Sequence, residues 1–305
     1  MWGFFNQKGE LMRMSDKILR GLALNGNVRV LVAKTTDIVS HAQKIHGTYP
    51  AASAALGRVM SVASVMGSML KDEREKLVID IRSDGELNHI MVNADNRGFV
   101  RGLVSNPHTH KVNEANGKLD VGGVIGNGTL SVSQEFEGNT IFNSQVALQT
   151  GEIGEDFAFY FAQSEQIPSA VSVGVLLNED LTIKSAGVIL VQVLPSATDA
   201  DIDVIEDVFS KLKPVSTLMI DASAEEVFNG LFEDIELLQE TPIEYFCGCN
   251  RTQMEGALRT LDNKDLEEMI REDKGAELEC HYCHSKYPFS EADLNKIITD
   301  RQNQS

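Results

Sequence analysis

The sequence predicts a mixed α+β protein in three parts, and three observations support this prediction. Strand-like and helix-like patterns alternate through the first part of the chain, which is typical of an α/β core domain. After Pro195 the composition changes to short amphipathic segments rich in acidic residues, and all four cysteines of the 305 residues lie near the C-terminus. We therefore expect a core domain over 14–195, an acidic helical linker over 196–240 and a small cysteine domain over 241–300.

Bulk composition indicates a folded protein with no overall electrostatic attraction to nucleic acid or anionic lipid. Hydrophobic residues make up 42% of the chain, and the formal net charge of −18 argues against attraction to nucleic acid or anionic lipid. The start of the chain is too short and too polar for a signal peptide. The apolar run 51–70 contains Arg58 and several serines, which favours a buried helix over a membrane span. With no cysteines elsewhere, these features point to a reducing cytoplasm.

The core domain follows from short local patterns. Residues 28–34 are rich in β-branched side chains, so we predict a strand there. Helices are expected over 37–45 and from Pro50, because proline suits the first turn of a helix. A further helix is expected over 152–164. Further strands are expected over 77–82, 87–94, 98–104, 129–134, 141–148, 170–177 and 182–194.

The segment 199–240 combines acidity with helical spacing of apolar residues. It holds twelve acidic residues and two basic ones. Pro214 interrupts the apolar pattern, and Ser223 to Glu226 forms a capping-box signature ahead of a second apolar run. Short helices of this kind are marginal alone and need a surface on which to pack. Two interpretations stay open, a solvated linker without a special role and a metastable element that can detach.

The cysteines stand in two close pairs, Cys247 with Cys249 and Cys280 with Cys283. Four thiolates suit a tetrahedral Zn²⁺ site best. A C-terminal segment of fewer than about 60 residues rarely forms a stable core without a bound metal or disulfides to stabilise it. Disulfides are the alternative, because thiolates are the species that oxidants attack. Gly248 relaxes the backbone of the first pair, and the second pair is also spaced for a local disulfide. Spacing alone leaves a structural zinc site and a redox-switched one both open.

Other patterns that could carry chemistry are weak. The glycine-rich stretch 122–128 lacks the ending of a P-loop, so we interpret it as a turn before a strand. His281 and His284 flank a site that four cysteines already complete, and His41 and His46 lack the glutamate of a zinc-protease helix. We find no Ser-His-Asp or paired-carboxylate pattern, so an enzyme is not expected.

The cysteine pairs lie within longer blocks that match one known family in order. These blocks are Cys247-Gly-Cys249-Asn250-Arg251 and Cys280-His-Tyr-Cys283 with Tyr287-Pro-Phe289, preceded by 54–58, 101–102, 160–168 and 192–195. Together they resemble the redox-regulated heat-shock holdase chaperones, the 33-kDa chaperonin family. The resemblance covers about residues 15–298. It departs at Gly187-Val188, where a Gly-Gly pair is expected, and at Asn250, where serine is commoner.

The resemblance implies an α/β core domain with a central twisted sheet and packed helices, a helical linker and a C-terminal zinc domain. It also implies a cytoplasmic, ATP-independent holdase that is inactive while Zn²⁺ binds Cys247, Cys249, Cys280 and Cys283. Oxidation would pair Cys247 with Cys249 and Cys280 with Cys283, release zinc, unfold the zinc domain and loosen the linker.

The implied active protein is a homodimer that holds unfolding client proteins. We expect the apolar faces of the linker to contact these clients, through Ile205, Phe209, Phe228, Leu231 and Phe232. Membranes and nucleic acids are not expected as partners. The alternative function is a nucleic-acid-binding zinc-ribbon protein, which the acidic balance of residues 250–279 disfavours.

Overall fold

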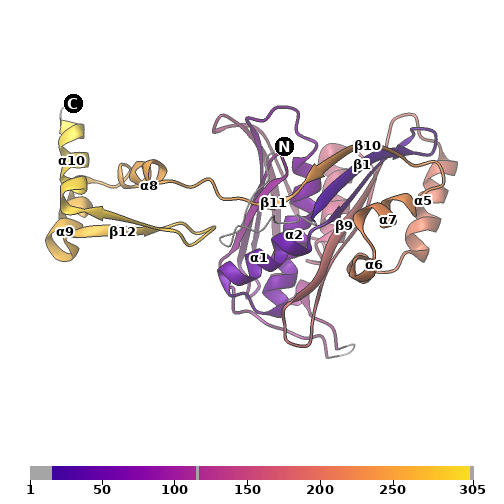
Figure 1. Cartoon of the computed structure of the whole chain (residues 1–305), viewed down its shortest axis with the longest axis horizontal. Coiled ribbons are helices and arrows are strands. Elements are labelled where there is room, and N and C mark those ends of the chain that lie inside the picture. The colour runs from indigo at the N-terminus through magenta and orange to yellow at the C-terminus, as the bar shows by residue number, and fades with distance from the viewer. Residues whose placement is uncertain (1–15, 115–116, 303–305) are drawn as a thin grey trace, which may run out of the picture. The chain divides into compact units, whose positions relative to one another are not determined.

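The protein is described by a computed structural model that covers residues 16–114 and 117–302, and the chain divides into two compact units. The first unit extends to Phe246 and the second begins at Cys247. Helices and strands occur in both units, so the predicted mixed α+β class is confirmed (Figure 1).

Two sheets form the frame of the first unit. The five-stranded sheet has the order β10-β1-β2-β9-β8, and the six-stranded sheet has the order β11-β5-β4-β3-β6-β7. Neighbouring strands are antiparallel except for β11, which pairs in parallel with β5. The strands are β1 (Lys17–Ala23), β2 (Val28–Lys34), β3 (Glu75–Ser83), β4 (His89–Ala94), β5 (Phe99–Val104), β6 (Gly128–Phe136), β7 (Asn139–Ala147), β8 (Ser169–Leu177), β9 (Ile183–Val193), β10 (Glu236–Pro242) and β11 (Glu244–Tyr245).

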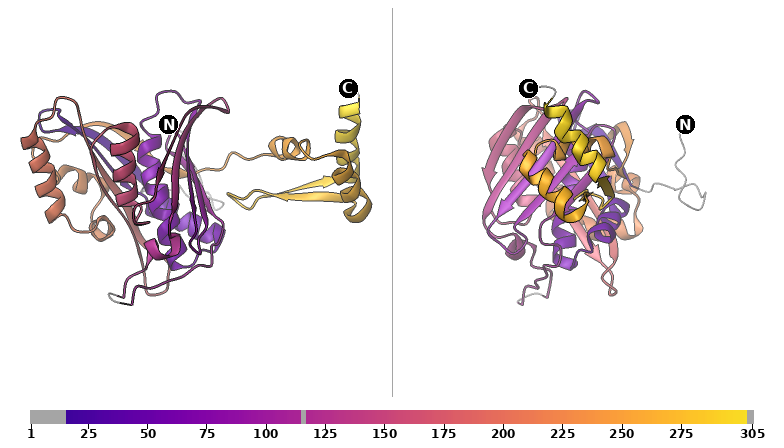
Figure 2. Two further views of the ribbon diagram at one scale, coloured as in Figure 1. Left: turned by 180° about the vertical axis from the view of Figure 1, so that it is seen from behind. Right: turned by 90° about the vertical axis from the view of Figure 1, so that its left-hand side faces the viewer.

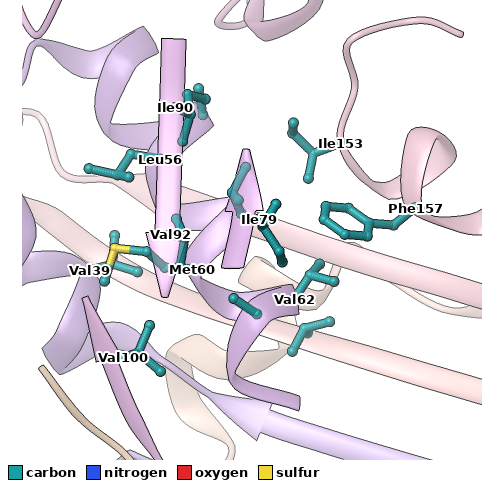
Figure 3. Close-up of a cluster of buried hydrophobic side chains, with 14 of the residues drawn as sticks. Val39, Leu56, Met60, Val62, Ile79, Ile90, Val92, Val100, Ile153 and Phe157 are labelled. Carbon is teal, nitrogen blue, oxygen red and sulfur yellow. The ribbon is translucent and has the colours of Figure 1, made fainter. Parts of the chain in front are cut away.

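Helices α1 (Thr36–His46) and α2 (Pro50–Gly67) fill the space between the sheets. All residues of α2 except Arg58 are buried, as predicted for a core helix. Its small residues allow close packing, because a Cβ on Gly57 would lie 2.6 Å from Cγ1 of Val39 on α1. Figure 3 shows side chains of this core, with Leu56 and Met60 of α2 among them. No helix within 16–114 or 117–302 is long and apolar enough to cross a membrane.

The glycine-rich stretch predicted as a turn contains a short helix instead. Helix α3 (Val121–Ile125) starts there because the carboxylate of Asp120 accepts a hydrogen bond from the Gly123 N–H at 2.9 Å. The helix predicted over 152–164 is α4 (Gly154–Tyr160), continued by a π-helical turn, η1 (Phe161–Glu165). The rings of Phe157, Tyr160 and Phe161 are all buried.

The segment predicted as a linker belongs to the first unit. It forms α5 (Asp199–Lys211), α6 (Val215–Asp221), α7 (Ala224–Asn229) and β10, so the boundaries predicted at 195 and 240 differ from the single division after Phe246. The predicted capping box forms at α7, where the Ser223 hydroxyl accepts from the Glu226 N–H at 3.2 Å. The strand β10 was not predicted, because its partner β1 lies more than 200 residues earlier in the chain.

The acidic helices cover the face of the five-stranded sheet that points away from α2 (Figure 1). Their apolar side chains join Leu19, Val30 and Val191 of the sheet in a second core cluster. Gly21 of β1 permits this close approach, because a Cβ there would lie 2.5 Å from the ring of Phe228. The charge of these helices faces solvent while their apolar stripe supports the sheet, which explains how so acidic a segment is folded.

Asp16 is a buried carboxylic acid at the start of β1. One carboxyl oxygen accepts from the Ile38 N–H at 2.9 Å, and its backbone carbonyl accepts from the Ile243 N–H at 3.0 Å. The other carboxyl oxygen, Oδ1, is buried without a hydrogen-bond partner among the described residues. Burial, and then the charge of Asp37, raise the pKa of Asp16 to about 8.

Replacing Asp16 with asparagine should change how stability depends on pH. The folded protein keeps this proton up to about pH 8, whereas the unfolded chain releases it near pH 3.8. The contribution is therefore complete below pH 3.8 and is lost progressively as pH rises towards 8. Urea unfolding from pH 5 to 9 should show this decline in the wild type but not in Asp16→Asn. The exposed Asp203→Asn variant is the control, and parallel curves for wild type and Asp16→Asn would contradict the buried proton.

Within residues 247–302, the second unit contains one hairpin and three helices (Figure 2). Side chains cap two of these helices at their starts, because Asp262 accepts from the Asp265 N–H at 2.9 Å and Ser290 accepts from the Asp293 N–H at 3.3 Å. The hairpin was not predicted. The elements are α8 (Arg251–Leu258), α9 (Asn263–Asp273), β12 (Gly275–Glu279), β13 (Lys286–Ser290) and α10 (Glu291–Gln302). The small core contains Leu258, Leu266, Phe289, Leu294, Ile297 and Ile298.

Candidate metal centre

The four cysteines meet in the second unit, where their Sγ atoms all lie within 4.8 Å of one another. The Sγ atoms of Cys247 and Cys280 are 3.7 Å apart, and those of Cys249 and Cys283 are 3.3 Å apart. Four sulfurs placed about 2.3 Å from a zinc ion form a tetrahedron with edges of about 3.8 Å. The cluster therefore has the size and the donor set of a tetrathiolate zinc site.

The second cysteine pair is presented by the turn between β12 and β13. The Cys280 N–H donates to the Ser285 carbonyl at 3.0 Å, and the His284 N–H donates to the Cys280 carbonyl at 2.8 Å. His284 adopts a left-handed conformation with φ of 55°, which closes this tight turn. The strand pairing continues directly from the turn at Glu279 and Lys286, so the hairpin fixes where both sulfurs lie.

The first cysteine pair is anchored by the helix that follows it. Asn250 caps α8 by accepting from the Gln253 N–H at 3.0 Å, a role that serine fills equally well, so this departure from the family pattern keeps the geometry. The guanidinium of Arg251 lies 4.2 Å from the ring centre of Phe289 and pairs with Asp293 at 3.0 Å. It also donates to the Pro288 carbonyl. These contacts hold the segment of Cys247 and Cys249 against β13, the strand that follows Cys280 and Cys283 in the chain.

Two hydroxyl groups lie beside the sulfurs. The Tyr287 hydroxyl is 3.1 Å from Sγ of Cys249 and donates to the Cys249 carbonyl at 3.0 Å, while the Ser285 hydroxyl is 3.3 Å from Sγ of Cys283. Burial raises the pKa of Cys249 to about 12 and also raises the pKa of Cys280. Burial opposes the Cys283 thiolate too, but hydrogen bonds with the Ser285 side chain and backbone and with the Cys249 and Cys280 side chains together outweigh it and lower the pKa of Cys283 to about 7. Zinc, when bound, would keep all four sulfurs deprotonated.

Comparison with known proteins identifies a family that matches this chain's sequence over a range that includes its four cysteines. A family model described as Hsp33 protein matches residues 16–290, which span parts of both units and include all four cysteines. The chain belongs to the Hsp33 family. The resemblance inferred from the cysteine blocks is thereby confirmed.

Relatives of known name extend over nearly the whole chain. The 33 kDa chaperonin of Staphylococcus carnosus is 39% identical over 289 residues, covering 93% of this chain and 98% of the relative. That of Shouchella clausii is 40% identical, covering 95% and 99%. The crystal structure of the 33 kDa chaperonin from Thermotoga maritima matches with a TM-score of 0.87 at 33% identity, covering 95% of this chain and 99% of that one. Membership of the Hsp33 family supports a chaperone function.

Removing the Tyr287 hydroxyl should weaken zinc binding without unfolding the second unit. Groups that contact a metal ligand orient it, and losing one typically costs about 10–100-fold in metal affinity. Competition with a chromophoric chelator should show a loss in this range for Tyr287→Phe. Tyr49→Phe, which removes a hydroxyl from an exposed ring in the first unit, is the matched control. Equal affinities for the two variants would show that the Tyr287 contact does not support the site.

The histidines examined in the sequence make other contacts in this Hsp33 family member. The imidazole of His284 pairs with the Glu279 carboxylate. Nε2 of His46 lies 2.8 Å from the Gly102 carbonyl oxygen, and the ring of His41 lies 5.0 Å from that of Tyr245. These contacts give His41 and His46 a packing role around β11, which follows the acidic segment.

The five residues expected to contact clients lie on the acidic helices and the turn after α7. Ile205, Phe228, Leu231 and Phe232 are buried with at most 6% of their surface exposed, and Phe209 is half-buried. All five pack in the cluster on the outer face of the five-stranded sheet. The fold therefore brings these side chains together but covers them. Sequence reasoning did not assign a role to Tyr287, Ser285 or Arg251. Tyr287 and Arg251 stood out only as part of the blocks that match the family, and Ser285 carried no signal.

Proposed function

We propose that the chain is a redox-regulated, ATP-independent holdase chaperone that uses Zn²⁺ held by Cys247, Cys249, Cys280 and Cys283. The observation that carries this proposal is the cluster of four thiols, all within 4.8 Å of one another, in a small unit of a chain from the Hsp33 family. Bound zinc would supply folding free energy to a unit whose own core has six buried apolar side chains. The zinc-bound, reduced state is the inactive one.

Oxidation is the proposed trigger. A peroxide oxidises one thiolate to a sulfenic acid and is itself reduced to hydroxide, and a second thiol attacks that sulfur, forms the disulfide and releases water. Two such reactions consume all four ligands. We propose the pairs Cys247–Cys249 and Cys280–Cys283, because the shortest loops close most readily once the unit loosens. The closest sulfurs in the reduced state belong to different pairs, so disulfide mapping distinguishes local from crossed bonds.

Loss of the metal is proposed to release the acidic segment. Residues 199–240 carry twelve acidic groups against two basic ones, so their mutual repulsion favours an extended state once packing weakens. Detachment would uncover Ile205, Phe209, Phe228, Leu231 and Phe232 together with the sheet face beneath them. An apolar surface of this kind suits unfolding proteins of many sequences, since burial of apolar area is not directional.

The proposed cellular location and partners are argued from the thiols and the net charge of the chain. Four reduced thiols persist in a reducing compartment, which supports the cytoplasm as the proposed location of the resting protein. The active form is proposed to be a homodimer. The net charge of −18 supports proteins, rather than nucleic acid or membranes, as partners.

The function is tested by light scattering of a heat-unfolded client enzyme without ATP. Peroxide-oxidised, zinc-free protein should suppress aggregation of the client, and reduced, zinc-loaded protein should not. Reduction with a thiol in the presence of zinc should abolish the activity again. Scattering that is unchanged by the oxidised protein would overturn the proposal.

A further inference from the structure

Strand β10 is an edge strand that contributes little to the core. It lies at the end of the five-stranded sheet and pairs with β1 alone. Of its seven residues only Thr241 is buried, and Leu237 and Leu238 are 48% and 55% exposed. Its register with β1 shifts between Arg20 and Gly21. The strand is therefore held mainly through its backbone, and it can leave without opening a cavity in the core.

The chain connection of β10 also favours its release. The exposed edge strand β7 of the six-stranded sheet, by contrast, is joined to β6 by the two-residue turn Glu137-Gly138, which keeps it in place. Strand β10 instead pairs with a strand more than 200 residues earlier, so no tight turn holds it. The four residues between Pro242 and Cys247 are held by the buried side chain of Ile243 and by the pairing of β11 with β5, so the release concerns β10 alone.

Charge complementarity links β1 to the segment that covers it. Lys17 and Lys34 are directly opposite each other on β1 and β2, an arrangement that is unfavourable without a counter-charge. Lys17 pairs with Glu240 of β10 at 3.0 Å and with Glu225 of α7. The Lys34 amine donates to the Ala222 carbonyl at 3.3 Å. The acidic segment thus neutralises a basic position beside the apolar face of β1 and β2.

The geometry points to β1 as a binding site for extended client segments, which pair with its edge after β10 has left. Backbone pairing needs no fixed side-chain sequence, because the hydrogen bonds join main-chain groups. The favoured ligand is an extended apolar segment that carries an acidic residue able to reach Lys17, as β10 itself does. This inference rests on the proposed holdase function and adds the place and the mode of client binding.

Hydrogen exchange read by mass spectrometry on the full chain tests the site. Oxidation should make about half of the β1 amides exchange faster, since alternate amides of a central strand face each neighbour. Adding a heat-unfolded client should protect the same amides again, while α2 stays protected throughout. The inference is overturned if β1 stays protected after oxidation, or if the oxidised protein suppresses aggregation of the client while the β1 amides stay unprotected. Absence of any suppression would instead contradict the proposed function.

A charge reversal provides a second test in the reduced protein. Lys17→Glu removes two ion pairs and should speed exchange of the β10-facing amides of β1 by about tenfold, the size expected for two partly exposed pairs. Lys76→Glu, on the exposed side of β3, is the matched control and should leave β1 unchanged. Equal exchange at β1 in both variants would show that charge does not hold β10 in place.

Discussion

Replacing Cys280 with serine should unfold the second unit and leave the first unit folded. Cys280 is the most buried of the four cysteines, with 5% of its surface exposed. Losing one thiolate from a four-ligand site removes much of the folding free energy that zinc supplies, which is roughly 10–16 kcal/mol in small zinc modules. A unit of this size has little else to hold it together.

Hydrogen exchange under reducing conditions measures this effect directly. Amides of β12, β13 and α9 should lose their protection in Cys280→Ser, whereas amides of α2 should keep theirs. A chelator added to the wild type should produce the same pattern. His281→Ser is the matched control, because His281 is the exposed neighbour of Cys280. Full protection of the hairpin in Cys280→Ser would mean that the second unit folds without the metal.

Replacing Phe228 with alanine should activate the protein without oxidation. The ring is 1% exposed and packs over Gly21 of β1, so truncation leaves a cavity between α7 and the sheet. Buried Phe→Ala changes typically cost about 3–5 kcal/mol. Helix α7 has six residues and little stability of its own, so this loss should detach the acidic segment locally.

Two measurements on the reduced, zinc-loaded Phe228→Ala variant check this expectation. Urea unfolding should show the loss of stability, and light scattering should show suppressed client aggregation before any oxidant is added. Val204→Ala on α5, where the side chain is 42% exposed, should change neither quantity. If the Phe228→Ala variant is destabilised but still requires oxidation for activity, detachment of the acidic segment is not what allows client binding.

Local patterns predicted the elements whose signals lie within a few residues. Helix α2 was predicted from Pro50 and its apolar run, and α7 from the Ser223 to Glu226 box. Strands β1 and β10 were missed because their pairing is set by distant residues. The sequence of β10 also contains two glutamates and a proline, which are poor strand formers.

The division of the chain was harder to predict than its elements. The acidic composition of 199–240 indicated a separate linker, yet its apolar stripe packs on the sheet because Leu19, Val30 and Val191 would otherwise face water. The acidic residues that dominate the composition of such helices lie on the solvent-facing side. They do not indicate whether the apolar side packs against another element.

The ligand set was predictable, and the groups around it were not. Two close cysteine pairs predict a candidate metal site, with disulfides as the alternative, and the structure brings the four sulfurs together. Tyr287 reaches Cys249 only because the hairpin pairs Leu278 with Tyr287, and Arg251 reaches Phe289 only through the fold of the second unit. These contacts depend on strand register, which local patterns do not determine.

A peroxide titration of the reduced, zinc-loaded protein at raised temperature tests the central claim most directly. Zinc release, free thiols and suppression of client aggregation are followed in the same samples. The account predicts that one zinc ion leaves as the four thiols of Cys247, Cys249, Cys280 and Cys283 are consumed, and that activity rises along the same curve. Complete zinc release and thiol loss without activity, or full activity with the zinc still bound, would contradict it.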